Sequence, residues 1–329
     1  MTSHLPSRDV LRWALERAVQ APSVHNSQPW LWQIGKRCIH LFANSDLALP
    51  RTDPDARDLI LSCGAALNHV QIAFAAVGWQ ARIHRLPDPA DPDHLAAVEL
   101  HPAPPVETDI VLAAAIPRRR TDRRIYSSRS VPDSVIAMMG ARAARTGVML
   151  RRFDELTTLK RLVLEAEQRH HCDLGYMAEI STWSGRYGSI AGVPARNAPR
   201  PDRRSAIPAR TFAGAALPQP PDAEPTQDGA AVIALGTVAD DRLSRLRAGE
   251  ATSLVLLTAA AAGLATCPIT GPLEFADIRA VVGQDVFGST GAAQMLLRVG
   301  WALEHADPLP ATPRRPLHEV VTFDSGHLD

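Results

Sequence analysis

The spacing of apolar residues along this chain predicts helices that alternate with short strands. Apolar residues recur every three or four positions over residues 10–19, which predicts an amphipathic helix that Ser7 can cap and that stops at Pro22. The alternating patterns of residues 30–34 and 38–42 predict a hairpin that turns at Gly35-Lys36. Further strands are expected at 80–85, 98–100, 148–153, 231–237, 295–299 and 320–323.

Two long Ala-rich segments are predicted to be helices of the core. The first covers residues 57–77 and ends at Gly78, a good position for a left-handed cap. The second covers residues 241–264, with a break or bend near Gly249. The apolar run 254–269 is too short and too interrupted to span a bilayer, so it indicates a buried helix and its exit. Shorter helices are expected at 109–116 after Thr108, at 132–145 and at 154–185.

The two long helices resemble each other when Gly64 of the first is aligned with Gly249 of the second. Two core helices built from the same small residues could match in this way by chance. However, both helices end in Gly and both precede a short extended stretch. We therefore expect an α+β fold made of two degenerate halves, residues 1–105 and 106–329, each with a central helix.

Composition and charge exclude several function classes. Lys+Arg and Asp+Glu both number 35, so no global field favours nucleic acid or a membrane, and any anion site must be built locally. The four cysteines form no CxxC pair, which argues against a zinc site and a disulfide framework and fits a reducing cytosol. No signal peptide is recognisable. The adjacent residues 170–173 (His-His-Cys-Asp) cannot turn toward one ion on a helix, so no metal site is expected.

Two segments have the composition of a binding site. Residues 21–30 place two prolines and several short polar side chains in one connection, which suits hydrogen bonding to the edge of a planar polar ring, although a plain Asn/Ser/Pro-rich turn has the same composition. Residues 118–124 hold five arginines, and such a cluster is most often a solvated basic run or a nucleic-acid site. Arg119, Thr121 and Arg123 lie at alternate positions, so in an extended segment they would face one phosphate together.

Two further segments have an ordinary and a functional interpretation. The pair Arg314-Arg315 lies between prolines, which suggests either an exposed tail loop or a rigid placement of two guanidinium groups. The stretch 267–272 is either a turn that ends a helix or a place where backbone N–H groups approach a ligand beside Gly271. The sequence shows no GxGxxG after a strand, no GxxxxGK[ST] and no GxSxG, so Rossmann, P-loop and α/β-hydrolase folds lack their motifs.

These motifs together resemble the nitroreductase-like FMN oxidoreductases. Residues 21–30 resemble the flavin-contacting loop of that superfamily, and residues 119–123 resemble its FMN-phosphate motif, with Thr where Ser is commoner. Residues 268–271 are similar to the segment whose backbone faces the flavin N5 edge, and 314–315 to the basic residues that complete the phosphate site. The doubled length and the stretches 293–300 and 312–316 look most like the tandem-duplicated, actinobacterial Acg branch.

The resemblance implies a flavoprotein oxidoreductase with FMN as cofactor and NAD(P)H as co-substrate, in which NAD(P)H leaves before a nitroaromatic or quinone acceptor binds. The expected cofactor-binding residues are Ser23, Asn26, Gln28, Arg119, Thr121, Arg123, Pro268, Thr270, Gly271, Arg314 and Arg315. The side chains of residues 23, 26 and 28 would address the ring or the ribityl chain, the arginines with Thr121 the phosphate, and the backbone of residues 270 and 271 the N5 position. No side chain is expected to act as a general acid or base.

The order of the motifs departs from the family pattern. The first half has the polar loop but no Arg motif in residues 1–20, and the second half has the Arg motif but only 144–147 where the loop belongs. If the halves form an intrachain pseudo-dimer, one FMN site per chain remains and the second site is lost. We expect this pseudo-dimer to be a cytoplasmic monomer or a homodimer, with a small-molecule acceptor and no nucleic-acid or membrane partner.

The Pro-rich stretch from about 186 to 225 has no place in the minimal fold. Eight prolines lie between Pro194 and Pro225, with little periodicity. A mobile surface insertion and a lid over the flavin face are both open interpretations. A lid that blocks turnover would make the protein an FMN-storing or FMN-sequestering protein, which is the alternative to an enzyme.

Overall fold

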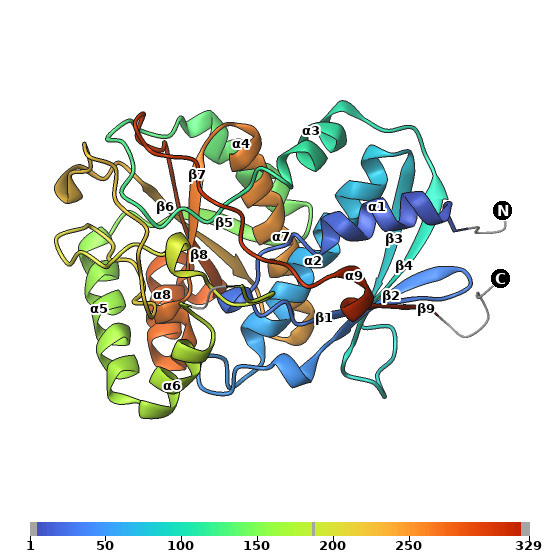
Figure 1. The fold of residues 1–329 in the computed structure, drawn as a ribbon, viewed down its shortest axis with the longest axis horizontal. Helices are drawn as coiled ribbons and strands as arrows, with labels where there is room; N and C mark the ends of the chain where they lie inside the picture. Colours follow the sequence, from blue (N-terminus) through green and yellow to red (C-terminus); the bar gives the residue numbers. More distant parts are fainter. Residues whose placement is uncertain (1–4, 186–187, 324–329) are drawn as a thin grey trace.

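The structure is a computed structural model that describes residues 5–185 and 188–323. Residues 186 and 187, with which the expected lid begins, lie outside the described residues, as do 1–4 and 324–329. Figure 1 shows helices arranged around two β-sheets, so the chain has an α+β fold.

The first sheet has the strand order β3-β4-β2-β1-β9. Its strands are β1 (Trp30–Ile34), β2 (Cys38–Ala43), β3 (Trp79–Arg85), β4 (His94–Pro102) and β9 (Val321–Phe323). The first four pair antiparallel, whereas β9 runs parallel to β1. A strand from the far end of the chain therefore completes the sheet of the first half.

The second sheet has the order β5-β6-β8-β7 and is antiparallel throughout. Its strands are β5 (Met149–Arg152), β6 (Ala231–Thr237), β7 (Ala265–Ile269) and β8 (Ala292–Gly300). Every residue of β6 is buried, because helices or loops cover both faces of this strand. The expected strand at 98–100 is the middle of the longer β4.

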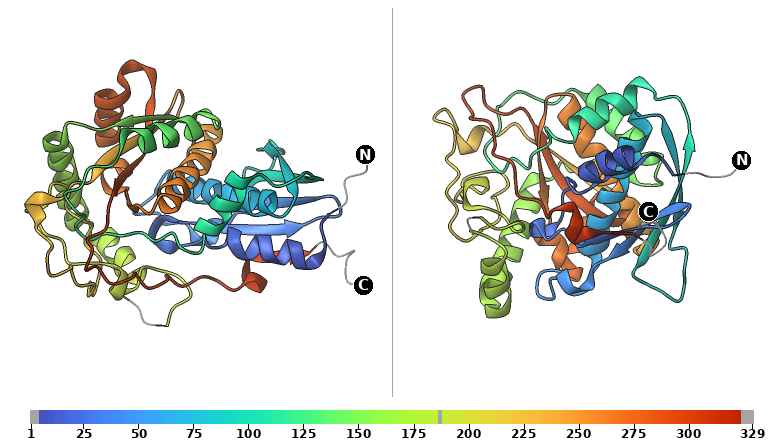
Figure 2. Two further views of the ribbon diagram at one scale, coloured as in Figure 1. Left: turned by 90° about the horizontal axis from the view of Figure 1, so that it is seen from above. Right: turned by 45° about the vertical axis from the view of Figure 1, so that its right-hand side comes forward.

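Helices α2 and α7 lie side by side between the two sheets, as Figures 1 and 2 show. The helices are α1 (Arg8–Ala18), α2 (Arg57–Ala76), α3 (Glu107–Ala115), α4 (Asp133–Ala144), α5 (Leu156–Cys172), α6 (Leu174–Thr182), α7 (Arg242–Ala261), α8 (Ala276–Phe287) and α9 (Leu317–Val320). The expected Ser7 cap is confirmed, since its side chain accepts a hydrogen bond from the Val10 amide. Gly78 has the expected left-handed conformation, with φ +88°.

The expected break near Gly249 does not occur, because α7 is continuous from Arg242 to Ala261. Gly249 is instead the point where α7 crosses α2. A Cβ atom there would overlap the carbonyl oxygen of Leu61, and a Cβ on Gly64 would overlap the carbonyl oxygen of Leu246. Gly64 and Gly249, which are aligned with each other in the sequence, therefore allow the two helices to approach closely.

One other helix expectation needs correction, and two helices, α8 and the short α9, had no counterpart among the expectations. The predicted helix at 154–185 is two helices, because Asp173 has an extended backbone and its carboxylate caps α6 by accepting from the Gly175 amide at 2.8 Å. Helix α8 was not predicted from the sequence. Its small-residue position Gly283 packs against the backbone of residues 291–293, a contact that no local pattern reveals.

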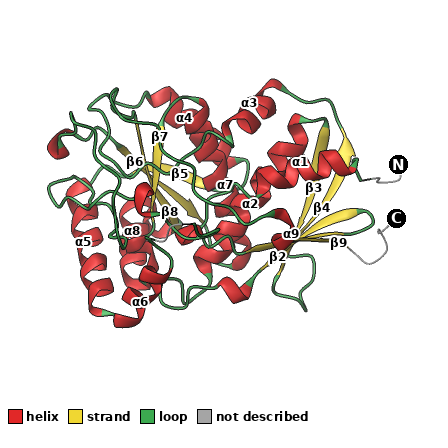
Figure 3. Cartoon of the chain, viewed as in Figure 1, coloured by secondary structure: helices red, strands yellow, loops and turns green. Residues whose placement is uncertain are grey.

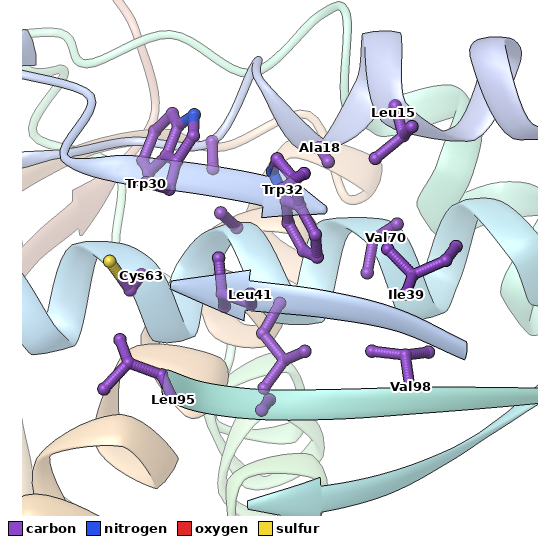
Figure 4. Close-up of a cluster of buried hydrophobic side chains, with 14 of the residues drawn as sticks. Leu15, Ala18, Trp30, Trp32, Ile39, Leu41, Cys63, Val70, Leu95 and Val98 are labelled. Atoms are coloured by element: carbon purple, nitrogen blue, oxygen red, sulfur yellow. The ribbon is translucent and has the colours of Figure 1, made fainter. Parts of the chain in front are cut away.

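Each sheet packs its own core against the central helices. In the first core, Trp30 and Trp32 on β1 and Leu41 on β2 are fully buried against α1 and α2, as Figure 4 shows. By length and composition α2 could cross a membrane, the one such helix among the described residues. However, 83% of its apolar window is buried inside the protein, as expected for a core helix.

The Pro-rich segment contains no α-helix or β-strand in its described part, residues 188–225, and Figure 3 shows it mostly as long loops beside α5 and α6. It is nevertheless packed. Val193, Ala198 and Phe212 are buried in one cluster with Tyr176 and Ile180 of α6. The segment therefore covers the side of the molecule where α6 lies.

Candidate functional site

The loop that follows α1 has an unusual backbone. His25, Asn26 and Gln28 all have positive φ angles, of 48°, 55° and 58°. Such angles are uncommon for residues other than glycine and cluster where the surrounding structure holds a strained conformation. Ser23 helps to hold this one, because its hydroxyl accepts a hydrogen bond from the Gln28 amide at 3.0 Å.

A cavity of about 450 Å³ lies between this loop and the second half of the chain. Six of the eleven sequence-predicted residues line it, namely Ser23, Thr121, Arg123, Pro268, Thr270 and Gly271. Helix α2 contributes Asp58 and Ser62 to the wall, and the side formed by α5, α6 and the Pro-rich segment combines apolar with polar residues. The polar loop and the Arg-rich motif thus border one cavity, although they are far apart in the chain.

Asn26 and Gln28 do not line this cavity. The Asn26 side chain donates to the carbonyl oxygens of Gly192 and Pro313, both at 3.1 Å. The Gln28 side chain donates to the carbonyl oxygen of Ile190 at 2.9 Å and accepts from the Arg315 amide at 2.8 Å. Both residues therefore join the polar loop to the Pro-rich segment and to the C-terminal segment.

The remaining predicted residues, Arg119, Arg314 and Arg315, lie on a second hollow of about 1130 Å³ between α1, the end of α3 and the C-terminal segment. Arg315 forms an ion pair with Glu319 at 3.3 Å. Arg314 donates to Asn26 Oδ1 at 3.0 Å and to the carbonyl oxygen of Gln20 at 3.1 Å. The Arg-rich motif therefore faces both hollows, with Arg119 on one and Thr121 on the other.

Arg119 carries an uncompensated charge. It is only 6% exposed, and neither Nε nor Nη1 has a hydrogen-bond partner among the described residues. Burial, Arg120 and Arg123 lower the pKa of Arg119 to about 10. Burial, Arg119 and Arg120 lower the pKa of Arg314 to about 9. An anion bound beside these buried like charges would stabilise their charged forms.

Arg123 lies on the wall of the first cavity and is bound to the Pro-rich segment. Its Nη1 donates to the carbonyl oxygen of Asn197 at 3.1 Å, and its guanidinium lies 4.9 Å from the ring centre of Phe212. Both partners belong to that segment. Burial lowers the pKa of Arg123, and the neighbouring Arg210 lowers it further.

A cluster of polar residues around Arg210 was not predicted from the sequence. This arginine donates to the Tyr176 hydroxyl and the Thr270 hydroxyl, both at 3.0 Å, and forms an ion pair with Glu274. His170 pairs with the same carboxylate at 3.1 Å and stacks on Tyr176. A Cβ on Gly271 would lie 3.2 Å from Arg210 Nη2, so the guanidinium lies close to the segment predicted to face N5.

Electrostatics fix the charge states in this cluster. Burial would raise the pKa of Glu274, but Arg210 and His170 lower it to about 2, so Glu274 is ionised. Burial and Arg210 lower the pKa of His25 to about 3, so His25 is neutral and accepts from Arg210 Nη1 at 3.2 Å. The sequence singled out His170 only within the run 170–173, and it gave no signal for Tyr176 and Glu274, because these residues reach the cluster through packing of distant elements.

No protein-family model matches this chain. Two known proteins, however, align with nearly its whole length. The chain is 56% identical to a Mycobacterium tuberculosis H37Rv protein provisionally named NAD(P)H nitroreductase Rv3131, over 98% of this chain and 94% of that protein. It is 37% identical to a second protein of the same strain, provisionally named NAD(P)H nitroreductase acg, over 97% of both. A solved nitroreductase with bound FMN from Bacteroides fragilis aligns with 62% of this chain and 94% of its own, at 13% identity and a TM-score of 0.40.

Proposed function

Because this chain belongs to the nitroreductase-like family that includes the acg protein, we propose that it is a flavin-dependent oxidoreductase with one FMN site between its two halves. NAD(P)H is the proposed hydride donor, and a small nitroaromatic or quinone is the proposed acceptor, bound in turn at the same place. The FMN would lie in the cavity of about 450 Å³, with its phosphate toward the second hollow.

The main support for this proposal is that two guanidinium nitrogens of Arg119 have no hydrogen-bond partner among the described residues. A phosphate dianion would supply acceptors for its buried Nε and Nη1 and would offset the repulsion between Arg119 and Arg314. Thr121, Arg123 and Arg315 are the other proposed phosphate contacts, since they lie on the same motif or beside Arg314. Each charge-assisted hydrogen bond of this kind contributes about 1.5–3 kcal/mol.

Another part of the cavity suits the flavin ring. Pro268, Thr270 and Gly271 line it, and we propose that the backbone N–H groups of residues 270 and 271 face N5. Ser23 would contact the ring or ribityl chain directly, and Asn26 and Gln28 would contact it once the Pro-rich segment moves off them. When bound, FMN supplies the hydride chemistry itself, and the protein positions the reactants and excludes water.

Contacts between the central helices support a tandem duplication with a single site per chain. Helices α2 and α7 cross at Gly64 and Gly249, and Ser253 donates to Asn68 at 2.8 Å, so a second pair of aligned residues is also in contact. Such contacts are expected of equivalent residues near a pseudo-twofold axis. We propose residues 1–105 and 106–329 as the two halves, the described part of 186–225 as a lid, and a cytoplasmic monomer or homodimer of this pseudo-dimer.

The proposed loss of the second site has a structural counterpart. Ala65 on α2 lines the cavity, and the same alignment pairs it with Glu250 on α7. Glu250 is buried and accepts two hydrogen bonds from Arg85, at 2.6 and 2.8 Å, and one from Gln71 at 3.0 Å. On α7, the ion pair between Glu250 and Arg85 therefore occupies the position equivalent to Ala65 in the cavity wall.

A storage protein is the second candidate function, and the contacts of the Pro-rich segment favour it. This segment hydrogen-bonds Asn26, Gln28, Arg123 and Thr270, four of the proposed flavin contacts. A segment held so firmly over bound FMN would keep NAD(P)H and the acceptor away from it.

The visible spectrum of the purified protein tests both candidates. An enzyme is yellow and bleaches when NADPH is added without oxygen, whereas a storage protein is yellow and stays oxidised. A colourless protein that takes up no added FMN contradicts both proposals.

A further inference from the structure

Asp58, in the first turn of α2, is a cavity residue whose two carboxyl oxygens have different surroundings. Oδ1 accepts a hydrogen bond from Arg57 Nη1 at 2.5 Å, whereas Oδ2 is buried with no partner among the described residues. The residue is 3% exposed and lines the cavity together with Ser23 and Ser62. Glu274, the neighbouring buried carboxylate, differs because Arg210 pairs with one of its oxygens and His170 Nε2 lies 3.1 Å from the other.

The charged groups that face Asp58 come from four segments. Arg57 is its neighbour on α2, Asp53 lies in the preceding loop, Glu274 follows β7, and Arg210 belongs to the Pro-rich segment. Burial raises the pKa of Asp58 to about 7, Arg57 and Arg210 oppose that shift, and Asp53 and Glu274 add to it. The two acids therefore offset much of the stabilisation that the two arginines give to a carboxylate.

Which hydrogen bonds the unpaired Oδ2 of Asp58 can make depends on whether the carboxyl group is protonated. An ionised carboxylate only accepts hydrogen bonds, so Oδ2 would repel the lone pairs of a ligand. A neutral carboxyl group instead presents one O–H donor, while Oδ1 still accepts from Arg57. The polar edge of the oxidised flavin ring presents two carbonyl oxygens and the unprotonated nitrogens N1 and N5 as acceptors, and N3–H as its one donor, so a neutral Asp58 finds more partners there than an ionised one.

We propose that Asp58 is a further binding residue of this cavity, which holds a proton on Oδ2 and donates it in a hydrogen bond to an acceptor atom of bound flavin. This inference rests on the proposed function, because it takes FMN as the ligand. It adds a donor on α2 to the contacts from residues 268–271, and it makes retention of FMN dependent on pH.

Titration of FMN binding between pH 7 and 9 tests this role, since the phosphate of FMN is already a dianion in that range. We expect the dissociation constant of the wild-type complex, measured by flavin fluorescence, to rise by about tenfold per pH unit once the free protein has lost the Asp58 proton. Asp58→Asn keeps an N–H donor and an acceptor for Arg57. It should bind FMN with a dissociation constant that is constant from pH 7 to 9, whereas Asp58→Leu should bind weakly throughout.

Asp109→Asn is the matched control, because burial also raises the pKa of Asp109 but this residue lies on α3, outside both hollows. It should keep the wild-type pH dependence. The infrared band of a protonated carboxylic acid should be present in the wild-type FMN complex and absent from Asp58→Asn; if that variant fails to fold, Asp58→Leu takes its place in this comparison.

The result that overturns the proposal is a wild-type affinity independent of pH, or a complex without that infrared band. The proposed function fails separately, if wild-type protein and Asp109→Asn bind no FMN at any pH.

Discussion

Arg119 combines burial, positive charge and two unpaired nitrogens, so its contribution should change sign when an anion binds. Without a ligand the side chain is destabilising, and with a phosphate beside it the same side chain is stabilising. The Arg-rich motif made this residue predictable from the sequence. That Arg119 faces one hollow and Thr121 the other was not predictable, because it depends on how the C-terminal segment crosses the motif.

Replacing Arg119 by Gln should therefore have opposite effects on two measurements. FMN affinity should fall by about 1.5–3 kcal/mol, or roughly 10- to 150-fold, as charged hydrogen bonds are lost. The melting temperature of the FMN-free protein should stay constant or rise.

Arg118→Gln is the control, since Arg118 is exposed and its Nε donates to the Ala114 carbonyl oxygen in the last turn of α3. Equal FMN affinities for the two variants would contradict the assignment of Arg119 to the phosphate.

His69 predicts how the protein responds to acid. Burial and Arg119 lower its pKa to about 3, and its Nδ1 lies 3.1 Å from the Arg17 carbonyl oxygen. Its pKa in the unfolded chain is about 6.5, so the unfolded state binds the proton first and stability falls as the pH drops from 6.5 toward 3.

His69→Asn keeps a donor for Arg17 and removes the titration. We expect this variant to be less stable at pH 7 but to lose about 1.4 kcal/mol less per pH unit between pH 6 and 4. Urea unfolding at pH 7, 6, 5 and 4 measures the free energies. An unchanged slope would show that His69 does not exchange a proton on unfolding; His25 keeps its own, similar contribution in both proteins.

At the scale of elements, the sequence predicts most helices and strands but not the purpose of every glycine. The alignment of the two long helices paired Gly64 with Gly249, and the structure puts these two residues against each other. The same Gly249 suggested a break in α7, because local propensity treats a mid-helix glycine as a weakness. A close helix crossing requires glycine without interrupting either helix, and only the partner helix reveals that need.

Gly249→Ala should therefore destabilise the protein far more than an ordinary helix substitution. The new Cβ meets the Leu61 backbone, which cannot move without displacing α2, so a loss of about 3 kcal/mol or more is expected. Gly140→Ala in α4 is the control. Its Cβ would have nothing closer than 3.9 Å, and the change should stabilise the protein by up to about 1 kcal/mol. The melting temperatures of the two variants measure these effects, and equal shifts would contradict this account.

At the scale of the whole molecule, the proposed single FMN site follows from the divergence of the two halves. The separation of the polar loop and the Arg-rich motif made such a site foreseeable from the sequence. The contacts of Asn26 with Gly192 and Pro313 were not foreseeable, since 166 and 287 residues separate these partners. Pairings over such distances depend on the assembled fold rather than on any local pattern.

FMN titration should therefore saturate at one equivalent per chain. Glu250→Ala should leave that stoichiometry at one while it lowers stability by about 2–3 kcal/mol, since Arg85 loses a buried partner but keeps some contact with water. Glu99→Ala, which breaks an exposed contact with His84 on the same sheet, should cost about 0.5 kcal/mol or less. A second equivalent of FMN in either variant would contradict the account of the second half.

Because β9 pairs with β1, the first sheet can be completed only late in synthesis. Strand β1 leaves the ribosome long before β9, its neighbour on one edge of the sheet. At about 5–20 residues per second, that edge of the first sheet stays open for roughly 15–60 seconds. The C-terminal segment that carries Arg314 arrives at the same late moment. If Arg314 binds the FMN phosphate as proposed, FMN is fully bound only after this segment has been translated.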